Sequence, residues 1–453
     1  MPAPPVSKRL LYRCYRIISD VQYWIRRRFT NGGQFVFTGL VLAAMVGVDT
    51  TRTLAYQVFA LLFCLLAFSI AFSLVWTAKF GAQRQLPRYG SVGVPLTYRV
   101  RLVNRTSKPQ AGLFLLENLV DPRPTLREFI EQSEPGEAER SWLSRWLGVS
   151  RWRWLATQRH RGRFRERAVP VLPPRGEVEM AVEIVPLLRG PLRFTGLSLA
   201  RPDPFNLLRA FSRVPLPQSL PVLPRRYPLP AFTLPGSMKY QHGGVALAST
   251  VGESEEFVSL RDYRPGDPVR HVHWRSWARM GKPIVKEYED EFFVRHALVL
   301  DTFLARGDSE VFEEAISVAA SFACTLQTQD SLLDLMFVGT EAYHFTSGRG
   351  LAHTDQILEI LASVQVCRER PFHSLEHLVA EHVARVSGCI CILLAWDGER
   401  QKLVRRLEAA EIPLLVMVLA EPGRAGDIAQ TGYRPERFHV LETGRVEEGL
   451  ARL

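Results

Sequence analysis

Two uncharged stretches of the chain, residues 29–48 and 53–78, constrain its fold more than any other feature of the sequence. Both are largely apolar, and each is long enough to cross a hydrocarbon core about 30 Å thick as a helix. The segment between them, Asp49-Thr-Thr-Arg-Thr53, is very short. The sequence therefore predicts a transmembrane helical hairpin over residues 29–78, preceded by a basic N-terminal segment over residues 1–28.

Charge around the two stretches predicts their orientation. Basic residues precede the first stretch at Lys8, Arg9, Arg13, Arg16, Arg26, Arg27 and Arg28. Lys79, Arg84 and Arg88 follow the second stretch, whereas the connecting loop holds only Arg52. Basic residues concentrate on the cytoplasmic side of membrane helices. We therefore expect a two-pass membrane protein with both termini in the cytoplasm, rather than a protein with a cleaved signal peptide.

Residues 85–230 follow a period of two, which is typical of strands with one buried face. In residues 94–103, apolar or aromatic side chains at the even positions Leu96, Tyr98, Val100 and Leu102 alternate with Thr97, Arg99 and Arg101. Further runs of this kind lie at residues 112–119, 163–172, 177–185 and 192–200, separated by Pro and Gly. Several short strands with such turns predict an antiparallel β-sandwich-like domain.

An insertion at residues 125–161 interrupts this pattern with alternating Trp and Arg. Its candidate lipid-facing residues are Trp142, Trp146, Arg151, Trp152, Arg153 and Trp154. Indole rings prefer the headgroup region and arginine pairs with lipid phosphate, so the segment could lie on an anionic membrane surface. Alternatively, the tryptophans pack on the sandwich and the arginines face water. Nucleic-acid binding is not expected, because no recognised motif accompanies the basic residues.

Residues 293–453 alternate between strands and helices. Buried strands are predicted at residues 296–300, 332–338, 389–394 and 413–419, with a further one at 438–441; helices are predicted at residues 310–325, 356–364, 375–386 and 399–410. Such alternation predicts a mostly parallel, doubly wound α/β sheet. Ligands of such sheets bind at the carboxyl ends of the strands. This directs attention to Asp301 and Asp397, which lie just after predicted strands.

Residues 240–292 contain the densest motif of the chain. Arg261-Asp262-Tyr263, Gly266-Asp267, Arg270, Trp274 and Ala278-Arg279 follow one another in a fixed order and spacing. This arrangement resembles the signature of the bacterial family called domain of unknown function 58, although Val272 replaces the usual isoleucine and Trp277 separates Ser276 from Ala278. The family's sandwich signature is also present at residues 161–164 and 203–207, with Asn206 where Gly is usual.

The resemblance runs from the predicted hairpin to about Leu419. It implies an anchor hairpin, a β region and a domain similar to the von Willebrand factor A fold. Members of the family commonly accompany MoxR-type AAA+ ATPases and transglutaminase-like membrane proteins. The resemblance thus implies a scaffold or adaptor that is anchored in the bacterial inner (cytoplasmic) membrane and binds such partners. It implies neither a biochemical activity nor a cofactor.

The residues of the signature themselves indicate a turn held by charge. Gly266 follows Pro265 and permits a tight turn. Asp267 could accept from the following amides or pair with Arg270, and Asp262 could pair with Arg261 or Arg279. This network could be purely structural or could form a docking surface. His271 and His273 would lie on one side of a strand and could bind metal, but a structural or solvent-facing pair is favoured. The acidic cluster Glu287, Glu289, Asp290 and Glu291 could be a catalytic acid set, but a strand edge or a solvated run is favoured.

The resemblance also raises the question of a metal site. Domains of the von Willebrand A fold often bind Mg²⁺ through Asp-x-Ser-x-Ser after the first strand, together with a later Asp. Here Phe303 and Ala305 occupy the two serine positions, so only Asp301 and Asp397 match. A hard cation needs several oxygen ligands. We therefore predict a degenerate site that binds no metal.

Three classes of function stay open on the sequence. The first is a membrane-anchored adaptor, and the second is an anionic-lipid-binding module built on the Arg/Trp segment. The third is a hydrolase, for which the sequence offers no Ser/His/Asp order, nucleotide loop or complete metal set. The chain is therefore expected not to be an enzyme.

Overall fold

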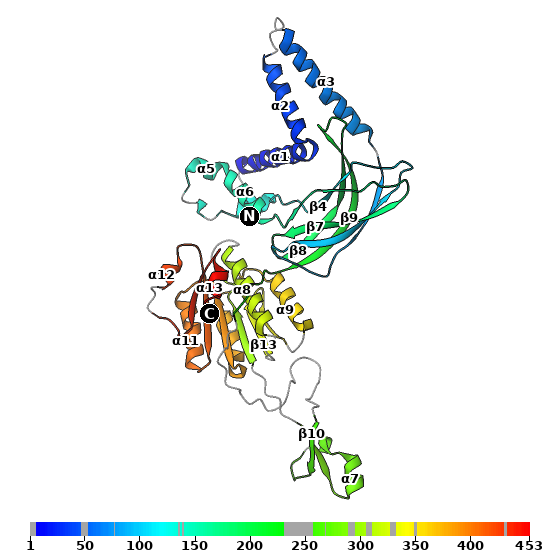
Figure 1. Cartoon of the computed structure of the whole chain (residues 1–453). Coiled ribbons are helices and arrows are strands. Elements are labelled where there is room, and N and C mark those ends of the chain that lie inside the picture. The colour runs from blue at the N-terminus through cyan, green and yellow to red at the C-terminus, as the bar shows by residue number, and fades with distance from the viewer. Residues whose placement is uncertain are drawn as a thin grey trace. The chain divides into compact units, whose positions relative to one another are not determined.

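The computed structural model describes residues 6–46, 53–76, 78–134, 136–137, 140–230, 257–267, 269–288, 295–304, 310–326, 332–347, 351–429 and 433–453. The chain divides into two compact units, Met1–Pro224 and Arg225–Leu453 (Figure 1). Both contain helices and sheets, so the predicted multidomain architecture of mixed helix and sheet is confirmed.

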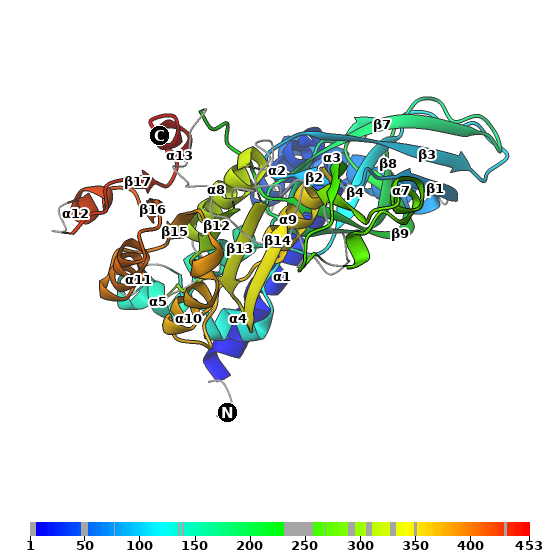
Figure 2. The ribbon, with the colours of Figure 1, turned by 90° about the horizontal axis from the view of Figure 1, so that it is seen from below.

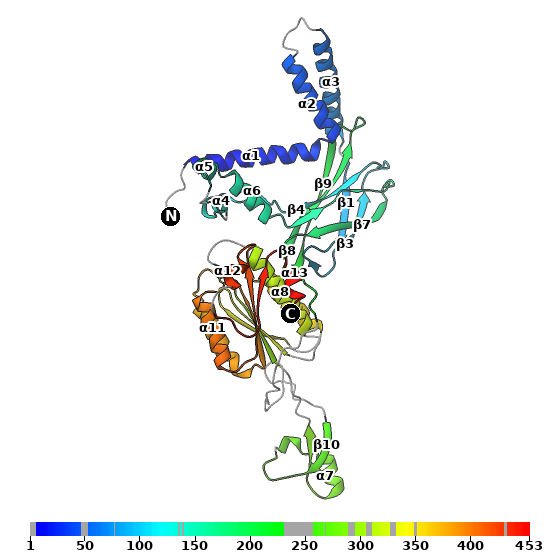
Figure 3. The same cartoon turned by 60° about the vertical axis from the view of Figure 1, so that its left-hand side comes forward.

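Three helices open the first unit: α1 (Val6–Arg28), α2 (Asn31–Val46) and α3 (Thr53–Val75). Helices α2 and α3 run side by side, and α1 lies across their base (Figures 1 and 3). Within the described residues, Leu54–Val75 is the one helix long and apolar enough to cross a membrane, whereas the apolar segment Asn31–Met45 is shorter. Residues 47–52, which include most of the predicted loop, lie outside the described residues.

Two sheets enclose the main core of the first unit. One has the order β1 (Phe80–Gln85), β3 (Leu96–Asn104), β7 (Glu177–Pro186) and β5 (Gly162–Phe164). The other has the order β2 (Gly90–Ser91), β9 (Arg209–Leu223), β8 (Gly190–Pro202), β4 (Phe114–Leu119) and β6 (Arg167–Ala168). Buried side chains of both sheets, such as Leu102 and Ile184 of the first and Leu115 and Leu199 of the second, share one apolar cluster.

The predicted strands of this region are found with four differences. Residues 163–172 form the two short strands β5 and β6 rather than one strand. Strands β1, β2 and β9 were not expected from the sequence. Strand β9 contains Pro215, Pro217 and Pro221, which usually argue against a strand because proline lacks an N–H for the ladder.

Three short helices follow β4: α4 (Leu126–Glu131), α5 (Trp142–Leu147) and α6 (Val149–Gln158). Thr125 and Glu128 form a capping box that starts α4. Gly148 separates α5 from α6 in a left-handed conformation with φ of 64°. Phe129 of α4 and Trp152 of α6 then pack on Tyr12 and Tyr15 of α1. The insertion therefore packs against α1.

A six-stranded sheet forms the core of the second unit, in the order β14 (Ala342–Ser347), β13 (Leu332–Val338), β12 (Arg295–Leu300), β15 (Gly388–Leu393), β16 (Leu414–Ala420) and β17 (Phe438–Glu442). Every neighbouring pair is parallel except β13 with β14. The strands other than β14 coincide closely with the predicted ones. The four central strands are buried, whereas the edge strands β14 and β17 are partly exposed.

Helices cover both faces of this sheet (Figures 2 and 3). They are α8 (Glu310–Leu326), α9 (Leu351–Ser363), α10 (His373–His382), α11 (Gly398–Ala409), α12 (Ala425–Ala429) and α13 (Val446–Leu450). Ala297 and Val299 of β12 belong to the apolar cluster that contains residues of α10 and α11. The alternating residues Leu298 and Leu300 are equally buried, so both faces of the strand are covered.

The signature segment forms a small module of its own. Strands β10 (Phe257–Asp262) and β11 (Ile284–Tyr288) pair antiparallel, and a 3₁₀ turn (Val269–His271) and helix α7 (Trp274–Met280) lie between them. The expectation that His271 and His273 share a strand is wrong, because His271 ends the 3₁₀ turn and His273 is the N-cap of α7. Residues 240–256 of the predicted segment lie outside the described residues.

Candidate functional site

A bidentate ion pair closes the turn of the signature module. Arg261, at the end of β10, donates to both carboxylate oxygens of Asp267 at 2.7 and 2.8 Å. Asp267 also accepts from the backbone N–H of Arg264 at 2.8 Å, and its own N–H donates to the carbonyl of Arg264 at 3.0 Å. Gly266 adopts a φ of 107°, which residues with a Cβ rarely adopt. The turn is thus locked from both sides of the glycine.

The partners in this turn differ from those that the sequence suggested. Asp267 pairs with Arg261 rather than Arg270, and it accepts from a preceding amide rather than a following one. Asp262 pairs with Lys282 at 2.8 Å rather than with Arg261 or Arg279. The antiparallel hairpin is the physical reason, because it returns the chain from β10 to β11 and places Lys282 beside the end of β10.

The Asp267 pair gives a pH-dependent prediction. Donation by Arg261, together with the Arg264 N–H, lowers the pKa of Asp267 to about 2. A lowered carboxyl pKa contributes stability above the unfolded pKa of roughly 4, and this stability is lost as the pH falls towards the folded value. We expect Asp267→Asn to speed hydrogen exchange within residues 257–288, and exchange in the wild type, corrected for its intrinsic pH dependence, to speed up between pH 4 and pH 2.

Asp262→Asn is the matched control, because its ion pair with Lys282 is more than half exposed on both side chains. Exposed pairs contribute little to stability. Hydrogen exchange measured by mass spectrometry should therefore be unchanged in this control. Equal exchange in wild type and Asp267→Asn would contradict a locking role for the ion pair.

An exposed aromatic pair lies on the same module. The rings of Trp274 and Trp277 stack with centroids 5.2 Å apart, and the two side chains are 60% and 37% exposed. Val269, Met280 and Tyr263 are further exposed apolar or aromatic residues of the module, and the signature residues Arg270 and Arg279 are also exposed. The signature therefore contains both a structural lock and an exposed apolar surface.

The two aspartates of the degenerate site, Asp301 and Asp397, both pair with an internal cation, Arg400. Its Nε donates to Asp301 at 2.7 Å, one terminal nitrogen donates to Asp397 at 2.5 Å, and the other donates to the carbonyl of Phe303 at 2.8 Å. Asp301 is fully buried and also accepts from the backbone N–H groups of Phe303 and Leu394. Burial raises the pKa of Asp301, and Arg400 opposes that rise.

The position of Arg400 explains why this site is closed. Asp301 follows β12 and Leu394 follows β15, at the point where the strand order turns from one side of the sheet to the other. Ligands of such sheets enter this crevice. Here the guanidinium occupies it between Asp301 and Asp397, and Asp397 also caps α11 through the N–H of Arg400. Ala305 lies outside the described residues, and within the described residues no group of three His, Cys, Asp or Glu side chains could hold a metal.

Sequence reasoning found Asp301 and Asp397 but missed Arg400. A signal for it exists, because an N-capping Asp with Arg three residues later places both side chains on the same end of a helix. That spacing predicts the Asp397 pair. The link to Asp301, which is 99 residues away in sequence, arises only from the fold.

The sandwich signature at Asp203–Leu207 holds the elbow between α1 and α2. Asp203 accepts from the N–H groups of Phe205, Leu207 and Leu208, which fixes the loop, and Asn206 takes a φ of 55°. This left-handed backbone explains why glycine is usual at position 206. The N–H of Thr30 donates to the carbonyl of Leu207 at 3.0 Å, and its hydroxyl donates to the carbonyl of Asn206.

Close packing and an aromatic contact add to these hydrogen bonds. We call the contacts of Thr30 and Gly33 with Asn206 and Leu207 the clasp. A Cβ added at Gly33 would lie 2.0 Å from the carbonyl oxygen of Leu207, so the backbones meet where only glycine fits. Phe205, in turn, makes an edge contact with Phe68 of α3, with centroids 5.5 Å apart. The second family motif therefore joins the helices to the sheets.

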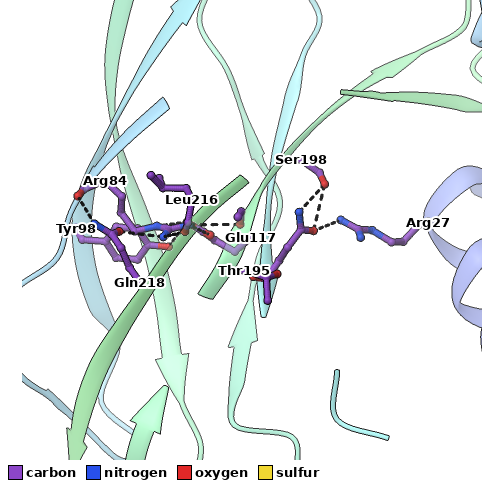
Figure 4. Close-up of polar contacts among 10 residues, drawn as sticks. Arg27, Arg84, Tyr98, Glu117, Thr195, Ser198, Leu216 and Gln218 are labelled. Carbon is purple, nitrogen blue, oxygen red and sulfur yellow. Dashed lines mark hydrogen bonds and ion pairs between the residues drawn. The ribbon is translucent and has the colours of Figure 1, made fainter. Parts of the chain in front are cut away.

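A buried polar network crosses the interior of the first unit (Figure 4). Arg84 of β1 donates to Glu117 of β4 at 3.1 and 2.5 Å, and both side chains are fully buried. Tyr98 donates to Glu117 at 2.6 Å, and Arg84 also donates to Gln218 at 3.0 Å. Burial raises the pKa of Glu117, and the positive charge of Arg84 opposes that rise. The pKa of Tyr98 is raised mainly by burial and also by the neighbouring Glu117. Because this network links the two sheets and every polar group in it has a partner, we interpret it as structural.

The six residues expected to face lipid differ in their exposure to solvent. Arg151 is buried and pairs with Glu137, and Trp152 is buried against Tyr12 and Tyr15. The expectation that these two face lipid is wrong, and Trp152 packs on α1 rather than on the sandwich. Trp154 is partly buried beside the same cluster, and Arg153 is exposed. Trp142 and Trp146 of α5 are 71% and 54% exposed.

Of the acidic cluster at residues 287–291, only Glu287 lies within the described residues. Glu287 belongs to β11, while Glu289, Asp290 and Glu291 lie outside the described residues. His273, the other candidate ligand of that region, contacts the hydroxyl of Ser276 through Nδ1 at 2.6 Å, one turn into the helix that it caps. This is a local contact at the start of α7.

Comparison with known proteins addresses the signature module and the α/β sheet together. Residues 259–387 match the family described as "Protein of unknown function DUF58". The chain is also 26% identical, over 185 residues, to the "Uncharacterized protein YeaD" of Bacillus subtilis (strain 168). That similarity covers 40% of this chain, and the chain spans only 45% of the length of this relative. The segment that carries the locked turn, the exposed tryptophans and the first strands of the α/β sheet is therefore the part of the chain that matches the DUF58 family.

Proposed function

We propose that this protein is a membrane-anchored adaptor that binds a second protein through its signature module. The stacked pair Trp274 and Trp277 carries this proposal, because two large apolar side chains stay exposed beside a turn held by a bidentate ion pair. Rigid aromatic residues on a preorganised support are typical of residues that dominate binding energy at interfaces. Exposed basic residues surround the pair, so a partner with acidic side chains around an apolar pocket fits best.

The membrane anchor is the second part of the proposal. Helix α3 exposes apolar side chains along its length, including Leu54, Leu61, Phe63, Ile70 and Leu74. A soluble protein rarely leaves such a helix uncovered. In this proposal α2 crosses the bilayer beside α3, both termini lie in the cytoplasm, and the basic residues before α2 and after α3 support that orientation.

The α/β sheet serves in this proposal as a binding domain rather than an enzyme. In order along the chain, its strands are arranged 3-2-1-4-5-6 with an antiparallel third strand, which supports the proposed likeness to the von Willebrand factor A fold. Arg400 fills the crevice at the switch in strand order. A partner would therefore bind without a bridging metal. By its resemblance to the family, a MoxR-type AAA+ ATPase, with a transglutaminase-like membrane protein in the same assembly, is the partner we propose.

Substitution of Trp274 tests the docking surface. We expect Trp274→Ala to abolish recovery of the partner after cross-linking in native membranes, while the melting temperature of the purified protein stays that of the wild type. The reason is that Trp274 is exposed and its removal opens no cavity. Recovery is measured by quantitative mass spectrometry of the affinity-purified complex, with a MoxR-type ATPase as the expected protein.

Trp142→Ala provides the matched control, because Trp142 is an equally large and still more exposed indole on a different element. It should retain the partner at the wild-type level. Retention of the partner by Trp274→Ala would refute the assignment of this surface. Loss in both variants would show that recovery depends on exposed indoles in general, which also contradicts a specific docking site.

A further inference from the structure

Helix α1 carries an apolar stripe along its exposed side. Leu10, Cys14, Ile17, Ile18, Val21 and Trp24 are all exposed. Their spacings of three, four and seven residues place them on one face of a helix with 3.6 residues per turn. Seven basic residues and one acidic residue, Asp20, share the helix. Such a combination is typical of a helix that lies in a membrane interface.

The opposite side of α1 is already occupied by protein. Tyr12 is buried, and its hydroxyl donates to the carbonyl of Pro124 at 3.2 Å, just before α4. Tyr15 packs on Phe129 and Trp152, and its hydroxyl donates to the carbonyl of Leu147 at the end of α5. Because Tyr12 and Tyr15 point towards α4 and α6, the apolar stripe faces away from them.

The stripe therefore faces the side from which α2 and α3 extend. In Figure 3, α4 and α6 lie on one side of α1 and the pair α2–α3 extends from the other. Only Phe29 and Thr30 separate α1 from α2, and the clasp of Thr30 and Gly33 by Asn206 and Leu207 fixes the bend between them. A bilayer around α3 would thus meet the stripe of α1 at its surface.

Helix α5 extends this surface beyond α1. It lies beside the N-terminal half of α1 (Figures 1 and 3). Trp142, Leu143 and Trp146 of α5 are exposed, and Arg145 lies between them. Indole rings favour the depth of the headgroups, where arginine can pair with phosphate.

We propose that α1 and α5 together lie on an anionic phospholipid bilayer, with the stripe of α1 among the upper acyl chains and its basic side chains among the headgroups. This inference rests on the proposed function, because it needs α3 to cross the same bilayer. Continuity with the apolar helices and the positive charge of α1 select the bilayer as the occupant. The lipid contact would hold the first unit at a fixed tilt against the membrane.

Site-directed spin labelling of the full chain in lipid nanodiscs tests the proposal. Nitroxides at the native Cys14 and Cys64, each with the other reactive cysteines replaced by serine, report depth in α1 and α3. A label at R127C reports α4, where the Arg127 side chain is 78% exposed and pairs with Glu131 of the same helix. In discs that contain phosphatidylglycerol, we expect labels at Cys14 and Cys64 to be accessible to oxygen but not to a water-soluble nickel chelate. The label at R127C should show the reverse.

Comparison with discs of phosphatidylcholine alone tests the charge. The label at Cys14 should lie closer to water there, and adding Ile18→Asp with Val21→Asp should move it into water in both discs while the Cys64 label stays in lipid. Equal depth of Cys14 in both lipids would overturn the anionic preference. A Cys14 label in water, or one shielded from both reagents by protein, would overturn the inference while a deep Cys64 label upholds the anchor. A Cys64 label in water would refute the anchor itself.

Discussion

Replacing Arg400 by methionine will destabilise the α/β sheet domain by about 3–5 kcal/mol, the usual cost of removing one partner from a buried ion pair. Asp301 is fully buried, and Arg400 supplies its only counter-charge within the described residues. Two backbone N–H groups would still donate to Asp301, but they carry no full charge. The loss is measured as the change in free energy of unfolding in denaturant, followed by a probe in the second unit.

Arg406→Met is the matched control on the same helix. Arg406 pairs with Glu376, its side chain is 60% exposed, and Lys402 stays beside the same carboxylate. We expect a loss below about 1 kcal/mol. Equal losses in the two variants would show that Asp301 does not depend on Arg400. A rise in the wild-type melting temperature with Mg²⁺ would contradict the occupation of the site by Arg400, since any ligand of the native state stabilises it.

The second large effect concerns Arg84 in the core between the two sheets of the first unit. We expect Arg84→Met to lower the free energy of unfolding by about 3–5 kcal/mol, because Glu117 stays fully buried without its bidentate donor. Arg84 also stacks over the ring of Phe194, so packing contributes to the loss. Denaturant unfolding followed by a probe in the first unit measures this change.

A double variant distinguishes the charge from the packing. Arg84→Met with Glu117→Gln should recover part of the loss, because a neutral amide still accepts from Tyr98 and removes the unpaired charge. Arg101→Met serves as the control: its side chain is 43% exposed and its ion pairs with Glu177 and Glu179 are long. A double variant no more stable than Arg84→Met alone would show that packing accounts for the whole effect.

Secondary-structure elements were predictable from the sequence where all of their side chains, or those of one whole face, are buried. The strands β12, β13, β15 and β16 are mostly apolar, because a parallel sheet covered on both faces buries nearly every side chain. Strand β9 was missed because its prolines oppose a strand, and β14 because its residues Ala342-Tyr-His-Phe-Thr-Ser347 form a half-exposed edge. Period and burial thus predict central strands better than edges.

The contacts of side chains were predictable only within a helical turn or a tight loop. Gly266 was expected to turn the chain, and it does. The pairing of Asp267 with Arg261 was not expected. Arg270 is nearer to Asp267 in the sequence, but the end of β10 places Arg261 beside it. Trp152 was expected at a lipid or sheet surface, whereas α1, more than 120 residues earlier, covers it. Contacts this distant depend on the whole fold.

The clasp at the elbow of α1 and α2 has a consequence for the order of biosynthesis. Thr30 and Asn206 lie 176 residues apart, so a ribosome that adds about 5–20 residues per second makes the loop roughly 10–35 s after the elbow. If α2 and α3 form the proposed anchor, they would enter the bilayer before the residues that hold them are made. Insertion and formation of the clasp would then be separate steps, and a fault in Asp203–Leu207 would leave an inserted protein whose sheets fold without a fixed attachment to the membrane.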